Sequence, residues 1–140
     1  MHAVFFVSLQ KFMVMYAQED IKITKVASSK IQQTDFSHLP FGKYFTDHML
    51  VMDYASGEWA DPKIMPFQTI PMHPAMSAIH YGQSIFEGLK AYKHKDGRLS
   101  IFRPQMNAKR FNESAVRMCM PEVPENLFVE AIRKLVEIDS

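Results

Sequence analysis

We first consider the histidine, serine and cysteine residues of this 140-residue sequence, because their side chains can bind a metal ion or act as nucleophiles. His73 and His80 are seven residues apart with Pro74 between them, so no regular helix places both on one face. Asp47 and His48 are adjacent and would point to opposite faces of a strand. We therefore expect no metal site.

Nucleophilic and phosphate-loop motifs are also missing. Ser77 and Ser84 lie outside the Gly-x-Ser-x-Gly sequence of a nucleophile elbow. Cys119 is the single cysteine, which excludes an internal disulfide and a thiolate-based zinc site, and its methionine neighbours favour a small buried hydrophobic role. Gly82 and Gly88 form neither G-x-G-x-x-G nor a Walker loop.

An arginine could still bind a phosphate group, because the planar and always charged guanidinium pairs with two phosphate oxygens at once. Arg103 and Arg110 flank the first turns of a helix predicted to begin at Pro104. For either residue the alternative is a solvated helix arginine, which the residue type alone favours.

Residues 80–92 (HYGQSIFEGLKAY) stand out because they combine aromatic side chains, two glycines and a carboxylate. Glycine permits close approach of a backbone or a ligand, and aromatic side chains beside it can wall an apolar pocket. An ordinary hydrophobic core is the alternative interpretation. The aromatic residues of this segment are Tyr81, Phe86 and Tyr92.

The elements that would position these residues begin with short strands. Residues 21–26, 48–54, 89–94 and 98–102 have the alternation or the composition of strands. Asp96-Gly97 predicts that the last two runs form a hairpin, since glycine tolerates the positive φ of the turn.

Prolines and apolar periodicity determine the other elements. Four prolines between residues 59 and 74 exclude a helix and favour an edge strand or an extended connector. Residues 77–82 are predicted to turn the chain, and residues 104–118 and 127–138 to form amphipathic helices. The combination predicts an α+β fold with an antiparallel sheet and flanking helices.

Several motifs together resemble one family. Residues 78–92 are similar to the A-L-H-Y-G…F-E-G-x-K/R-x-Y pattern of branched-chain amino-acid aminotransferases, which are fold-type IV enzymes that use pyridoxal 5′-phosphate (PLP). Residues 41–49 (FGKYFTDHM) resemble F-G-x-x-F-T-D-H-M, residues 66–74 resemble the next family segment, and residues 102–110 resemble F-R-P-x-x-N-x-x-R. The resemblance spans about residues 28–140 and implies the smaller N-terminal domain of that fold.

The resemblance implies roles for five residues. Arg110 matches the arginine that binds the PLP phosphate. Phe86 and Gly88 match residues that line the substrate side-chain pocket, and Tyr81 matches a tyrosine that closes the pocket of the partner subunit. Phe41 stands where the family has an aromatic residue near the substrate.

The activity implied is transamination of leucine, isoleucine and valine with 2-oxoglutarate, in amino-acid biosynthesis. PLP would be the cofactor and electron sink. The partners implied are small amino acids and 2-oxo acids, and a second copy of the chain in a homodimer. Neither nucleic acid nor membrane is an expected partner, and we expect a cytoplasmic protein.

One family feature is missing. The catalytic lysine lies in a K-x-G-G-N-Y context in the second half of the family fold, and nothing in this sequence resembles it. Lys90 is nearest to the pocket motif, but the alternation of strand faces predicts that it points elsewhere. We therefore assign no catalytic residue, and we expect an incomplete N-terminal portion that is inactive alone. The alternatives are a non-catalytic binding or assembly domain and an inactive truncated product.

Domain organisation and composition complete the expectations. We place an N-terminal extension and lead-in at residues 1–40 and the aminotransferase domain at residues 41–140. Within the apolar segment 3–17, we weigh a secretory signal against an extension that precedes a true start at Met15. The formal charge of +1 argues against a dedicated nucleic-acid binder, and no window approaches the ~20 apolar residues that span a bilayer.

Overall fold

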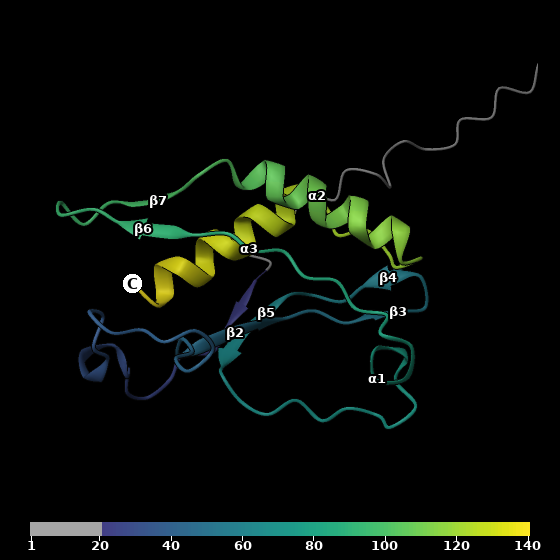
Figure 1. Ribbon diagram of the computed structural model, residues 1–140, viewed down its shortest axis with the longest axis horizontal. Coiled ribbons are helices and arrows are strands. Elements are labelled where there is room, and N and C mark those ends of the chain that lie inside the picture. Colours follow the sequence, from purple (N-terminus) through teal and green to yellow (C-terminus); the bar gives the residue numbers. More distant parts are fainter. Residues whose placement is uncertain (1–20) are drawn as a thin grey trace, which may run out of the picture.

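The computed structural model describes residues 21–140, which form an α+β fold with two long helices lying over short strands (Figure 1). The predictions for residues 3–17 and for Met15 lie outside the described residues. In chain order the elements are β1 (Lys22–Ile23), the 3-10 helix η3 (Ile31–Gln33), β2 (His48–Val51), β3 (Tyr54–Ala55), β4 (Glu58–Trp59), β5 (Lys63–Pro66), α1 (Ser77–Tyr81), β6 (Ala91–Lys93), β7 (Leu99–Ile101), α2 (Pro104–Arg117) and α3 (Glu125–Ile138).

The main sheet has three strands in the order β1-β5-β2, and two further pairs, β3-β4 and β6-β7, form separate two-stranded sheets. The three pairs β2-β5, β3-β4 and β6-β7 are antiparallel, as predicted. The pair β1-β5 is parallel, which corrects the expectation of an antiparallel sheet. The parallel pairing arises because the amides of Lys22 and Thr24 donate to the carbonyls of Pro62 and Ile64, at 3.1 and 2.8 Å. Residues that we placed in the lead-in thus form a strand of the sheet.

The proline-rich segment holds the central strand of this sheet, so the prediction of an edge strand or connector is wrong for residues 63–66. Residues 67–73 form neither helix nor strand, as predicted for a connector. Pro62 precedes β5 and Pro66 is its last residue, opposite His48. The missing N–H groups therefore fall at the ends of the strand, where they interrupt the ladder least. Between the two prolines, Ile64 is fully buried and pairs with Leu50 of β2.

The hydrophobic core lies where α3 packs over the sheet. Its buried members are Ile21, Ile64 and Ala131, with Leu50, Leu135 and Ile138 packed around them. A buried hydrogen bond completes the same contact, because Nδ1 of His48 on β2 lies 2.5 Å from Oδ1 of Asp139, the C-cap residue of α3. Helix α3 thus packs against the sheet, and α2 packs against α3 (Figure 1).

The local predictions for the second half of the chain are confirmed. Strands β6 and β7 pair antiparallel around Gly97, whose φ is +84°. Helix α2 begins at Pro104, as expected for a residue with a fixed φ and no N–H. The predicted turn at residues 77–82 is the short helix α1, which ends at Gly82 in the left-handed conformation. None of the helices in residues 21–140 is long and apolar enough to cross a membrane.

The C-terminus of α2 is a Schellman motif with an unusual residue at its left-handed position. The amide of Met120 donates to the carbonyl of Ala115 at 2.9 Å, and the amide of Cys119 donates to that of Val116 at 3.1 Å. Cys119 occupies the left-handed position with φ +53°. Its side chain is exposed, so its predicted burial is wrong. Glycine usually occupies this position because it has no Cβ to clash in that conformation.

Cys119→Gly is expected to raise the free energy of unfolding by about 1 kcal/mol, because it removes the Cβ from a left-handed position. Urea denaturation measures this change. The matched control is Cys119→Ala, which removes the thiol and keeps the Cβ, and which should leave stability nearly unchanged. An equal gain in both variants would contradict the backbone explanation.

Ile64→Ala is expected to lower the free energy of unfolding by about 2–5 kcal/mol, since it leaves a cavity in the central strand. The control Ile70→Ala truncates a side chain that is 49% exposed and should cost less than about 0.5 kcal/mol. Equal losses in the two variants would show that β5 is not the centre of the core.

Candidate functional site

The candidate site lies where the extended segment 82–90 runs along α2. This segment forms neither helix nor strand, and side chains hold it in place. At one end the Gln83 side-chain amide donates to the carbonyl of Met118 at 2.8 Å. At the other end the Asn107 side-chain amide donates to the carbonyl of Gly88 at 3.1 Å. One end of the segment is therefore fixed to α2 and the other to Met118, the C-cap residue of the same helix.

An ion pair between Glu87 and Arg110 is the central contact of this site. The Arg110 Nε donates to Glu87 Oε2 at 2.9 Å, and its Nη2 donates to Oε1. The Asn107 side-chain amide donates to the same Oε1 at 2.8 Å. Asn107 and Arg110 are three residues apart on α2 and so project from one face toward Glu87.

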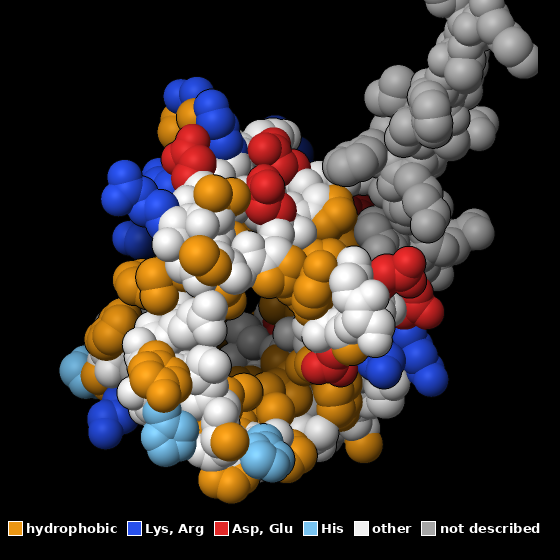
Figure 2. Space-filling model, turned by 90° about the vertical axis from the view of Figure 1, so that its right-hand side faces the viewer, with side chains coloured by type: hydrophobic (Ala, Val, Ile, Leu, Met, Phe, Trp, Pro, Cys, Tyr) orange, Lys and Arg blue, Asp and Glu red, His pale blue; other side chains and the backbone are white. Residues whose placement is uncertain are grey.

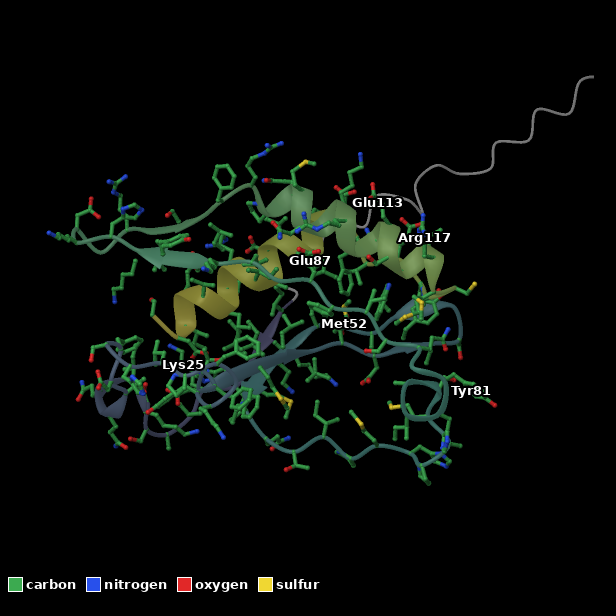
Figure 3. The ribbon with its side chains drawn as sticks, viewed as in Figure 1. Lys25, Met52, Tyr81, Glu87, Glu113 and Arg117 are labelled. Atoms are coloured by element: carbon green, nitrogen blue, oxygen red, sulfur yellow. The ribbon has the colours of Figure 1, made fainter. Side chains whose placement is uncertain are left out.

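The two partners differ in exposure. The Glu87 side chain is 8% exposed, whereas the Arg110 side chain is 60% exposed. The carboxylate of Glu87 thus lies buried between the segment 82–90 and the helices (Figure 3), whereas the guanidinium of Arg110 reaches the surface.

This arrangement shifts the pKa values of Glu87 and Arg110 in the directions that favour their charged forms. The hydrogen bond from Arg110 lowers the pKa of Glu87 most; desolvation opposes this shift and the hydrogen bond from Asn107 adds to it. Reciprocally, the hydrogen bond and the charge of Glu87 raise the pKa of Arg110. The carboxylate and the guanidinium are therefore both ionised at neutral pH.

A depression of about 530 Å³ opens beside Arg110. Three of its lining residues are cations, namely Lys90, Arg103 and Arg110, and no Asp or Glu is among the described residues that line it. A surface of this charge suits an anion. The remaining lining residues are Gly88, Leu89, Tyr92, Phe102, Met106 and Asn107.

The structure brings two of the five residues implied by the resemblance together. Gly88 and Arg110 line the same depression. Phe86, Tyr81 and Phe41 do not line it, and their exposed fractions are 91%, 86% and 104%. Tyr81 lies on α1, and its ring is directed outward, away from Glu87 (Figure 3).

Sequence reasoning missed three residues of this site. Glu87 and Asn107 had no assigned role, although the spacing from Asn107 to Arg110 is that of neighbours on one helix face. Lys90 was predicted to point elsewhere, yet it lines the depression. Arg103, a candidate phosphate-binding arginine to which the resemblance gave no role, lines the depression too. Residue 90 precedes β6, so the alternation of strand faces does not apply to it.

Apolar side chains cover much of the surface beyond the depression. Figure 2 shows them across one face, which is hollowed near its middle. The large exposed hydrophobic residues include Phe36, Phe41, Phe45, Phe67, Ile79, Tyr81, Phe86 and Phe102. Where exposed apolar side chains gather into a patch, they mark contact with other protein surface or with ligands. Within residues 21–140 no three His, Cys, Asp or Glu side chains gather to hold a metal ion.

Comparison with known proteins finds relatives over most of the chain. It is 46% identical over 116 residues to branched-chain-amino-acid aminotransferase 2 of Bacillus subtilis, a match that covers 82% of this chain and 32% of the relative. It is 50% identical over 109 residues to branched-chain-amino-acid transaminase 1 of the same organism, covering 77% and 31%. The chain is related to the branched-chain-amino-acid aminotransferases.

Relatives in other bacteria agree with this relationship. The branched-chain-amino-acid aminotransferase of Mycolicibacterium smegmatis is 42% identical over 117 residues, which cover 83% of this chain and 32% of the relative. The chain thus spans about a third of the length of the curated aminotransferases that it matches. No protein-family model matches the sequence.

Acidification is expected to break the contact between Glu87 and Arg110. Because the folded-state pKa of Glu87 lies below its unfolded value of about 4.3, the pair stabilises the fold above that pH. Its contribution is lost as the pH falls through the lower folded-state pKa. Carbon NMR of the Glu87 carboxyl group measures the titration directly.

The stability of Glu87→Gln supplies the control for this titration. The difference in unfolding free energy between the natural chain and this variant should be constant from pH 5 to 7 and should shrink below about pH 4. A difference independent of pH down to pH 2 would contradict the shift.

Proposed function

We propose that this chain is the N-terminal domain of a PLP-dependent branched-chain-amino-acid aminotransferase of fold type IV. The observation that carries the proposal is Arg110, held by Glu87 at a depression lined by cations, in a chain 46% identical to a curated aminotransferase. The smaller size of the chain relative to those enzymes is consistent with one domain of such an enzyme.

The residues at the depression fit the phosphate group of PLP. A phosphate monoester carries up to two negative charges, and the lining offers the guanidinium of Arg110 with Lys90 and Arg103 close by. We propose that Arg110 binds this phosphate and that Gly88 leaves room beside it. When bound, PLP supplies the electron sink for amino-group transfer.

The proposed substrates are leucine, isoleucine and valine, with 2-oxoglutarate as the amino-group acceptor. Phe86, Gly88, Tyr81 and Phe41 are the proposed substrate-pocket residues. The high exposure of the three aromatic side chains supports a pocket that further protein surface completes, including that of a second subunit in a homodimer. We also propose that the enzyme works in the cytoplasm.

The catalytic lysine is proposed to come from protein outside these 140 residues, because their sequence contains no K-x-G-G-N-Y. The chain is expected to show no transaminase activity by itself. A chimera therefore provides the direct test. In it, the matched 116 residues of this chain replace the corresponding segment of branched-chain-amino-acid aminotransferase 2 of Bacillus subtilis.

The chimera is expected to form glutamate from leucine and 2-oxoglutarate, as measured by a coupled assay with added PLP. Arg110→Ala in the chimera should weaken PLP binding by about tenfold or more, because a charge-assisted bidentate contact is lost. The matched control is Arg98→Ala, which removes another exposed arginine paired with a carboxylate, Asp96, at the hairpin.

Two results would contradict the proposal. One is a folded chimera that transfers no amino group from any of the three substrates, which would favour a non-catalytic domain. The other is an equal loss of PLP affinity in the Arg110→Ala and Arg98→Ala chimeras, which would place the phosphate elsewhere.

A further inference from the structure

The contact between Glu87 and Arg110 uses a single edge of the guanidinium. Glu87 accepts hydrogen bonds from Nε and Nη2 of Arg110, so this edge is occupied. A guanidinium has five N–H donors in one plane, and those of Nη1 and the outer one of Nη2 lie on the edge that Glu87 does not contact. No further hydrogen-bond partner of the Arg110 guanidinium is found within residues 21–140. Two parallel donors thus remain for a second anion.

The burial of the two side chains determines which way that second edge faces. Glu87 is 8% exposed and does not line the depression, whereas Arg110 is 60% exposed and does. The carboxylate therefore contacts the guanidinium from the protein side and takes no space from a ligand. The free edge is left on the side of the depression.

Glu87 is itself fixed, which a positioning role requires. The side-chain amide of Asn107 donates to Glu87 Oε1 at 2.8 Å and to the carbonyl of Gly88 at 3.1 Å. One amide thus fixes both the carboxylate and the backbone that follows it. Because Asn107 and Arg110 belong to the same helix, the three side chains form a closed network between α2 and the segment 82–90.

We propose that Glu87 is a positioning residue that orients Arg110 so that its outer edge accepts a phosphate group in the depression. This inference rests on the proposed function and adds a role for a residue that does not touch the ligand. An arginine side chain without a partner loses much rotamer freedom when it binds a phosphate. Arg110 is paired with Glu87 and has therefore lost that freedom before the ligand binds.

The proposal and simple electrostatics predict opposite changes in phosphate affinity when the charge of Glu87 is removed. A carboxylate beside a phosphate site repels the ligand, so removing its charge should tighten phosphate binding. If Glu87 positions Arg110, removing the charge should weaken binding instead. The sign of the change in affinity therefore separates the two roles.

The experiment uses the full 140-residue chain and inorganic phosphate as the probe. Phosphate is titrated at pH 7 while the Arg110 Nε–H signal and the backbone amide signal of Gly88, which lines the depression, are followed by nitrogen NMR. We expect Glu87→Gln to raise the dissociation constant by about tenfold and Arg110→Ala to abolish the response of the Gly88 amide. Asp96→Asn is the matched control, since it breaks the exposed pair with Arg98 and should leave phosphate affinity unchanged.

A second variant and a second probe guard against an effect on folding. Glu87→Asp keeps the charge but shortens the side chain, so it should also weaken phosphate binding. Sulfate, which stays doubly charged down to about pH 3, should bind the natural chain more weakly as the pH falls toward the lowered pKa of Glu87. A role in stability alone would not produce this pH profile in a chain that remains folded.

The outcomes are distinguishable. Phosphate binding that is unchanged or tighter in Glu87→Gln overturns the positioning role and leaves Arg110 as a phosphate ligand. The absence of any response of Arg110 to phosphate in the natural chain overturns both that ligand role and the positioning role, since nothing is then positioned. Weaker binding in Glu87→Gln and Glu87→Asp, with no change in Asp96→Asn, supports the inference.

Discussion

Side chains of α2, rather than a β-ladder, hold the segment 82–90 in place, and the candidate site depends on this attachment. Glu87 receives hydrogen bonds from Arg110 and Asn107, and Gln83 reaches the carbonyl of Met118. Each contact joins the segment to α2 or to its C-cap residue, Met118. The buried carboxylate of Glu87 is the strongest of these links, because its donor Arg110 is charged and contacts both of its oxygens.

The position of α2 depends in turn on the layers beneath it. The rings of Phe111 and Phe128 pack α2 against α3, with centroids 5.4 Å apart. The buried side chain of Asn112 makes two hydrogen bonds to the backbone of Val123 in the loop between the helices. At its far end α3 is fixed to the sheet through the hydrogen bond between Asp139 and His48. The depression thus opens at the outer side of a stack whose core is at Ile64.

Local signals in the sequence predicted the second half of the fold well. Asp96-Gly97 predicted the hairpin, Pro104 the start of α2, and apolar spacing the course of α3, because each of these depends on nearby residues alone. The prolines near β5 led to a wrong prediction for this strand. Proline is unfavourable in the interior of a central strand, whereas these prolines lie at its two ends. The parallel pairing of β1 was not predictable, because its partner is some 40 residues away in sequence.

For the site, the sequence by itself determined the family relationship and the candidacy of Arg110 and Gly88, because motif residues and their spacing are properties of the chain alone. Only the tertiary structure decided that Glu87 and Asn107 belong to that site and that Lys90 and Arg103 share its lining. It also left Tyr81, Phe86 and Phe41 on the surface. The physical reason is that a charged pair between residues 87 and 110 forms when two elements pack, and their packing is determined by the distant core around Ile64.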